Sequence, residues 1–204
     1  MKDKFFEMCE EAKKIFPEAK RYETEEDDEN SYEFRIIIDE EYNEKVKNKI
    51  ISAISLSFWF SGKISEIITG AKVYCSYKGK IIENTFQKYV SGKDFRYLSS
   101  IRYRNTILKF LKNKKEEYLN KLKEMKDKFI ENLEEKIMEK ELEILCEKLD
   151  CEIYPDNDGA IKISEEDFNN DRKVILQMLK DERFQKAVKE LKKIMDEYKL
   201  LARI

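Results

Sequence analysis

The 204-residue sequence contains no histidine and only five glycines and two prolines. Histidine is the residue most often used as a general base near neutral pH and as a metal ligand, so its absence disfavours both roles. The scarcity of glycine and proline predicts few tight turns, and therefore long helices and strands. No apolar run approaches the length of a membrane-spanning helix, and the charged first residues are not those of a secretion signal. The sequence predicts a cytoplasmic protein without a membrane segment.

Cysteine is also scarce. Cys9, Cys75, Cys146 and Cys151 show no Cys-x-x-Cys spacing, and such pairs, or histidines, would be needed for a zinc site. We therefore expect four reduced, mostly buried thiols, no bound metal and no cofactor.

Charge is what the chain has in excess, because 41% of its residues are Asp, Glu, Lys or Arg, against roughly a quarter in an average domain. Both signs are mixed through most of the sequence, which is typical of solvated helices rather than disorder. The exception is the range 62–115, which we call the basic segment. It contains thirteen Lys or Arg and three acids, a formal charge of +10, whereas the parts before and after it each carry −6.

The first third of the chain predicts a helix, a linker and a strand. Residues 3–16 have apolar side chains at helical spacing, and Pro17 ends the run. The acidic run from Tyr22 to Ser31 predicts a loop or disordered linker, because its like charges repel one another. Tyr32 to Asp39 alternates apolar and polar residues, which predicts a strand. We expect a helix from about Glu40.

The glycines predict an antiparallel meander in the middle of the chain. Four of the five glycines lie between residues 62 and 92, and three of them are followed by lysine, so the tight turns would carry lysines. The range 54–60 favours a strand, although the preceding helix could continue through it. We expect further strands at 71–77 and 80–86, with a helix as the alternative for 81–90.

The second half predicts helices, because residues 93–154 contain neither glycine nor proline. We expect the first helix to begin at Asp94 and to break near Asn113. A second helix to about Asp150 would project, fold back as a helical hairpin, or form a coiled coil with another chain. A small β-hairpin at 151–163 and two helices separated near Asp181 complete the prediction.

Together these patterns predict an α+β fold, with a mostly antiparallel sheet in the N-terminal half and long helices in the C-terminal half. Composition predicts three parts. Residues 1–30 would be an N-terminal helix with an acidic linker, residues 31–112 a basic α+β domain, and residues 113–204 a helical region.

The basic segment predicts a nucleic-acid-binding function. Such binding needs cations placed against phosphates, and side chains that read or stack on bases. The segment offers lysines at the expected turns, arginines on the following helix and interleaved tyrosines, among them Tyr74 and Tyr89, that can stack on unpaired bases. The predicted contacts are Lys63, Lys72, Lys78, Lys80, Lys93, Arg96, Arg102 and Arg104. The hypothesis is a non-enzymatic nucleic-acid-binding or accessory protein, with RNA and DNA equally open.

Two alternatives remain. In the first, the long helices make an interaction or scaffold protein that forms a homo-oligomer or docks an acidic partner, and the basic segment is a solvated surface balanced by its acidic flanks. In the second, the protein is an enzyme acting on nucleic acid, with Tyr97 or Tyr103 as the nucleophile. No motif of high specificity supports an enzyme.

The loop before Glu165 matches part of a calcium-binding spacing through Asp156, Asp158 and Gly159. Tyr154 stands where the first ligand should be, so we expect a hairpin turn without calcium. The same two aspartates near a lysine are the weak basis for a metal-dependent nuclease.

Overall fold

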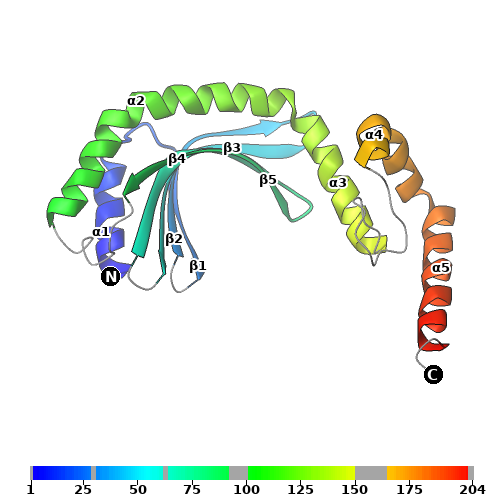
Figure 1. The fold of residues 1–204 in the computed structure, drawn as a ribbon. Coiled ribbons are helices and arrows are strands. Elements are labelled where there is room, and N and C mark those ends of the chain that lie inside the picture. The colour runs from blue at the N-terminus through cyan, green and yellow to red at the C-terminus, as the bar shows by residue number, and fades with distance from the viewer. Residues whose placement is uncertain (1, 29–30, 62–63, 92–100, 150–164, 202–204) are drawn as a thin grey trace. The chain divides into compact units, whose positions relative to one another are not determined.

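The computed structural model describes residues 2–28, 31–61, 64–91, 101–149 and 165–201 (Figure 1). The elements are α1 (Lys2–Lys13), β1 (Arg21–Asp28), β2 (Ser31–Asn43), β3 (Asn48–Ser61), β4 (Ile64–Tyr77), β5 (Lys80–Ser91), α2 (Ile101–Glu131), α3 (Leu133–Leu149), α4 (Glu165–Lys180) and α5 (Glu182–Leu201). The α+β class is confirmed. The chain divides into two compact units, 1–133 and 134–204. The domain boundaries predicted at residues 30 and 112 concern independent folding and stay a prediction.

The strands form one antiparallel sheet in the order β1-β2-β3-β4-β5, so each strand pairs with its neighbour in sequence. The predicted meander is confirmed, and the ranges 54–60 and 81–90 are both strand. Between β4 and β5 the loop is only Lys78 and Gly79, whose φ angles are 48° and 81°. Positive φ at both positions is the geometry that two-residue hairpins favour.

The loop predicted for the acidic run is wrong, because β1 occupies most of it and pairs with β2. The repulsion between its carboxylates is offset by Arg35 of β2, which forms ion pairs with Glu23 and Glu25. The run also packs an apolar surface, because the ring of Tyr22 stacks on Phe34 with the centroids 5.9 Å apart. A count of charges along the sequence does not show either partner, Arg35 for the carboxylates or Phe34 for Tyr22.

The helix predicted from about Glu40 is also wrong, because β2 continues to Asn43 and a turn over residues 44–47 leads into β3. The side-chain oxygen of Asn43 accepts a hydrogen bond from the backbone N–H of Val46 at 3.2 Å. The amide of Asn48 donates to the carbonyl of Val46 at 3.0 Å. Such local asparagine bonds compete with helix formation and favour turns.

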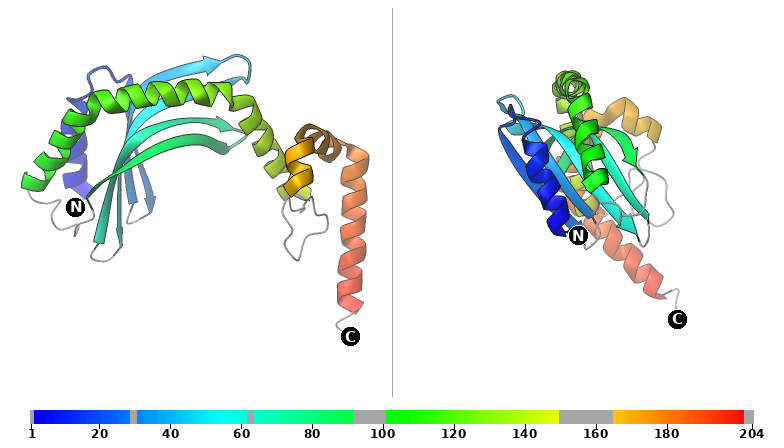
Figure 2. Two further views of the ribbon diagram at one scale, coloured as in Figure 1. Left: turned by 45° about the horizontal axis from the view of Figure 1, so that its top comes forward. Right: turned by 90° about the vertical axis from the view of Figure 1, so that its left-hand side faces the viewer.

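One face of the sheet, the covered face, lies under α1 and α2, which are on the same side of it (Figure 1, Figure 2). Phe5 of α1 meets Phe58 of β3 edge-on at 4.9 Å between centroids, and Phe86 of β5 meets Tyr118 of α2 at 6.4 Å. The core of the first unit includes Phe5, Phe16, Phe34, Ile54, Leu56, Phe58, Tyr118 and Phe129. We call the opposite face, which these helices leave uncovered, the open face.

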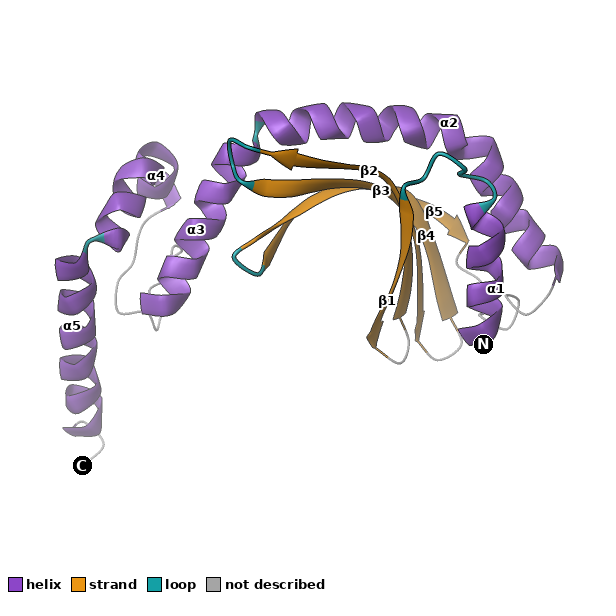
Figure 3. Cartoon of the chain, turned by 180° about the vertical axis from the view of Figure 1, so that it is seen from behind, coloured by secondary structure: helices purple, strands orange, loops and turns teal. Residues whose placement is uncertain are grey.

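The sheet bends strongly along its strands (Figure 3). Near the bend, a Cβ atom on Gly70 of β4 would lie 1.9 Å from the backbone oxygen of Phe86 in β5. Only glycine permits that approach. A register shift between Ile37 and Asp39 in β2 adds a second irregularity, after which Asp39 lies opposite Ser52. Ile37, which interrupts the alternation in the sequence, lies opposite Ala53 and is fully buried.

The predicted helix break near Asn113 is wrong, because α2 runs through it and ends at Glu131. Ion pairs support the polar run, since Lys114 contacts Glu117 at 2.5 Å and Lys115 contacts Glu18 at 2.8 Å. The helix start predicted at Asp94 lies outside the described residues. The expected long helix to Asp150 is two helices, α2 and α3, and a coiled coil is not confirmed.

In the second unit, the predicted separation of the last two helices at Asp181 is confirmed. The Asp181 carboxylate accepts hydrogen bonds from the backbone N–H groups of Arg183 at 2.8 Å and Phe184 at 3.4 Å, so it caps α5. Leu142, Ile175, Leu179 and Val188 form the buried cluster of this unit.

The β-hairpin predicted at 151–163 and the calcium-like loop lie outside the described residues, except for Glu165. Among the helices described, none combines the length and apolar character that crossing a membrane requires.

Candidate functional site

The predicted nucleic-acid contacts are spread over the first unit. Lys78 and Lys80 lie at the β4–β5 turn, Lys72 lies within β4, and Arg102 and Arg104 lie near the start of α2. Lys63, Lys93 and Arg96 are outside the described residues.

In the described part of the basic segment, five cations contact acids of the same chain. Arg104 shows this most clearly, because it links α2 to Glu7 of α1 at 3.1 Å and to Glu11 at 3.7 Å. The further ion pairs are Lys72–Glu83, Lys88–Glu117, Lys114–Glu117 and Lys115–Glu18. Folding therefore brings part of the acidic flanks against the basic segment and offsets part of its charge.

On the open face, Arg35 is the centre of a network of charged side chains. Its guanidinium contacts Glu33 at 2.5 Å and Glu23 at 3.9 Å, and the side chain is only 15% exposed. It also lies over the ring of Tyr74, 5.6 Å from the centroid. Burial opposes the charge of Arg35, but the hydrogen bond and attraction from Glu33, followed by Glu25, outweigh it and raise its pKa.

Tyr74 and Lys72 of β4 belong to the same network. The Tyr74 hydroxyl donates to Glu23 at 3.1 Å, and burial, reinforced by Glu23, raises the pKa of Tyr74 to about 12. Lys72 contacts Glu83 at 2.9 Å and lies 5.6 Å from the centroid of the Tyr74 ring. Lys72, one of the predicted contacts, is thus already partnered within its own chain.

Beside this network the open face carries a row of apolar side chains, Trp59, Ile68 and Tyr89, which we call the aromatic strip. Ile68 of β4 lies directly opposite Tyr89 of β5. On its other side, Ile68 has Trp59 of β3 as a diagonal neighbour. Trp59 is 46% exposed and Tyr89 is 52% exposed. The sequence contained a signal for Trp59, because it alternates with core residues and falls on the serine face of its strand, but only Tyr89 was among the predicted stacking residues.

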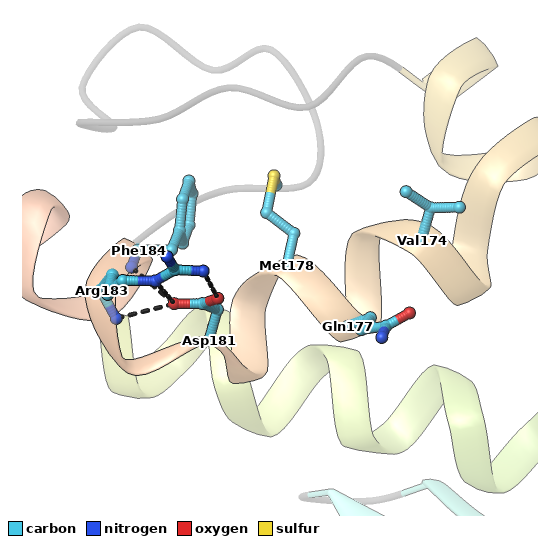
Figure 4. A pocket seen from close by; sticks show the side chains of 6 residues that line it. All are labelled: Val174, Gln177, Met178, Asp181, Arg183 and Phe184. Atoms are coloured by element: carbon cyan, nitrogen blue, oxygen red, sulfur yellow. Dashed lines mark hydrogen bonds and ion pairs between the residues drawn. The ribbon is translucent and has the colours of Figure 1, made fainter.

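The second unit has a hollow of about 610 Å³ at the junction of α4 and α5 (Figure 4). Val174 and Met178 form its apolar wall and are 63% and 37% exposed. Asp181 and Arg183 form an ion pair at 3.0 Å on its rim. The hollow is an apolar surface with one partnered charge pair on its rim.

The thiols offer no reactive group where they are described. Cys9 and Cys75 are free and buried, as predicted. Burial raises the pKa of Cys9 to about 12 and also raises that of Cys75, so neither thiolate forms near neutral pH. In the described parts of the chain, no group of three or more potential metal ligands comes together.

Comparison with known proteins adds no assignment, since no protein-family model matches the chain and no curated protein matches its sequence.

Proposed function

We propose that the protein is a non-enzymatic binding protein that holds single-stranded nucleic acid on the aromatic strip of its open face. The observation that carries the proposal is the exposure of Trp59 and Tyr89, at 46% and 52%, on a sheet face that α1 and α2 leave uncovered. Exposed aromatic rings on a sheet are stacking platforms for unpaired bases, and stacking tolerates any base.

The surroundings of the strip suit this role. Trp59 and Tyr89 are two strands apart, about 10 Å across the sheet, which leaves room for separate bases on each ring. Gln87 and Thr85 are exposed on the same face of β5, and Ser57 is half-buried on β3. Their amide and hydroxyl groups can donate to and accept from base edges.

Charge gives the bound strand a preferred path. The carboxylates on the open face of β1 and β2, among them Glu23, Glu25 and Glu33, would repel phosphates even though Arg35 partners them. The strand is therefore expected over β3, β4 and β5. On this face Lys72 already pairs with Glu83 of the same chain. Stacking is therefore expected to contribute more than phosphate contacts, and the affinity should fall only gently with salt, by a log–log slope of about 0.7 per phosphate contacted.

A fluorescence anisotropy titration with a labelled thymidine oligonucleotide tests the proposal. Trp59→Ala should weaken binding roughly ten- to hundred-fold, because one stacked base contributes about 1–3 kcal/mol. The matched control is Tyr42→Ala, since Tyr42 is 55% exposed and lies near the opposite end of the β2–β3 hairpin. The control should bind like the wild type.

Charge reversal at the β4–β5 turn tests whether nucleic acid binds to the aromatic strip or to the turn lysines. Lys78→Glu with Lys80→Glu should change the affinity less than Trp59→Ala does. If the turn variant abolishes binding while Trp59→Ala leaves it intact, the turn lysines are the site. If the wild type binds no oligonucleotide even at low salt, the proposed function is wrong.

A second candidate function, an interaction protein acting through its helices, is favoured by α5. Leu191 and Ile194 are 44% and 50% exposed, although they continue the apolar stripe of the buried Val188. A helix whose stripe lacks a partner is only marginally stable by itself. An oligomer seen by light scattering that Leu191→Lys dissolves, and that Asp196→Asn on the opposite side of the helix leaves intact, would support this function.

A further inference from the structure

The two edges of the sheet differ in how they are protected against pairing with another strand. An edge strand exposes unpaired N–H and C=O groups, and charge is a common protection. β1 carries five acids in its eight residues, so a second β1 would be repelled. β5 has twelve residues with Glu83 as its one acid, and in the described sheet it pairs only with β4. Among the described strands, the outer edge of β5 therefore has no partner strand.

The exposed apolar residues of β5 are arranged symmetrically. Ile81 and Tyr89 are 58% and 52% exposed. They lie on the open face at equal distances on either side of Thr85. Directly opposite residues in an antiparallel pair share a face. A two-fold axis at Thr85 therefore places Ile81 against the partner's Tyr89, and Tyr89 against the partner's Ile81.

We infer that β5 pairs antiparallel with β5 of a second copy of this chain, in a register centred on Thr85, so that the two sheets become one. Other registers fit less well. Centring on residue 84 places Ile81 opposite Gln87, and centring on residue 86 places Tyr89 opposite Glu83, so the apolar side chains stay exposed. Centring between two residues sets side chains of opposite faces against each other.

The architecture of the first unit is compatible with this pairing. α1 and α2 both lie on the covered face, so the open faces of the two copies would continue into each other. The dimer would carry two aromatic strips on one surface. The inference does not require nucleic-acid binding, because it depends on the edge of β5 and not on Trp59, although Tyr89 belongs both to this edge and to the aromatic strip.

Sedimentation velocity over a range of concentrations tests the dimer. The wild type should approach twice the 24.6 kDa mass of the chain. Thr85→Glu should stay monomeric, because it sets two carboxylates opposite each other at the axis. Its own fold should tolerate the change, since Thr85 is exposed and lies opposite Lys72 of β4. The control is Ser76→Glu, which adds the same charge on the same face but in β4, one strand away from the edge. The Ser76→Glu protein should dimerise like the wild type.

A mixing experiment tests the register. Thr85→Lys should also be monomeric alone, and a mixture of Thr85→Glu with Thr85→Lys should recover the dimer through opposite charges at the axis. Circular dichroism melting shows whether each variant is folded. A wild type that stays monomeric, as expected if the edge instead accepts an extended peptide, would overturn the inference. A Thr85→Glu protein that still dimerises, or a mixture that does not recover, would overturn it as well.

Discussion

At the scale of single residues, two partly buried arginines, Arg35 and Arg104, link different elements of the fold through ion pairs. Arg35 is 15% exposed and Arg104 is 21% exposed, and each contacts two or more carboxylates. Taking a charge out of water is costly unless it is paired, so each arginine fixes the elements that supply its partners. The Nε atoms of both arginines are buried without a hydrogen-bond partner, so the pairing uses only part of each guanidinium.

The buried hydrogen bond between Thr69 and Tyr118 gives a test at this scale. Both side chains are fully buried, and their hydroxyl groups contact each other beneath α2. Tyr118→Phe leaves the Thr69 hydroxyl without a partner, so the free energy of unfolding should fall by about 1–3 kcal/mol. Tyr118→Phe combined with Thr69→Val, which removes both hydroxyls, should cost less in urea unfolding. A double variant that loses the sum of the two single losses would show that the hydroxyls do not interact.

At the scale of elements, the position of α2 depends on the bend of the sheet. Gly70 allows β4 and β5 to approach, and the irregularity after Ile37 re-aims the end of β2. Beyond that irregularity, Asp39 and Glu41 both contact Lys126 of α2. The bend and the helix are therefore linked through one lysine.

Two glycines test the bend. Gly70→Ala should cost at least about 3 kcal/mol of stability, the upper end of overpacking costs, because the methyl group would overlap the backbone of β5. Gly79→Ala should cost only about 1–2 kcal/mol, since Gly79 has a φ of 81° but nothing within 4 Å of an added Cβ. Thermal unfolding compares them. Equal losses would mean that no close approach exists at Gly70.

The contact of Asp39 with α2 predicts a dependence on pH. The hydrogen bond from Lys126, opposed by burial and aided by Lys20, lowers the pKa of Asp39. Because the pKa of Asp39 is lower in the folded than in the unfolded state, its ionised carboxylate stabilises the fold at pH values above the unfolded pKa of about 3.9. This stabilisation is lost as the pH falls through the folded-state pKa. Asp39→Asn should therefore flatten the loss of stability below about pH 4, by a modest amount because solvent screens the pair. An unchanged acid limb in urea unfolding at several pH values would contradict this.

The sequence predicted the elements that carry their own pattern and missed those that depend on distant partners. Alternation in 32–39 and 54–60, together with the glycine turns after residue 62, predicted parts of β2 to β5, whereas the helix expected from about Glu40 covers the end of β2 and the start of β3. β1 was missed because its acids are balanced by Arg35, which comes later in the chain. The site behaved in the same way. Tyr89 was named from the sequence, but the partnering of Arg104 by Glu7, 97 residues away, is invisible to a count of charges.

At the scale of the whole molecule, folding pairs part of the charge that the sequence segregates. Among the described residues, cations of the basic segment meet acids from α1, from the residue range 14–20 and from within the segment's own strands. Exposed apolar side chains of the described residues gather on the aromatic strip, along β5 and on the stripe of α5. Our proposals therefore assign binding to aromatic and apolar surfaces rather than to a basic face.

The single tryptophan of the chain allows the most direct measurement. Trp59 lies on the open face and is 46% exposed, so all tryptophan emission reports on the proposed site. Titration with unlabelled single-stranded thymidine oligonucleotide should quench this emission in a saturable way, because a base stacked on the indole alters its excited state. The Tyr89→Ala variant should need more oligonucleotide to reach the same quenching. Emission that stays unchanged at low salt, while anisotropy reports binding, would place the nucleic acid elsewhere and contradict the account.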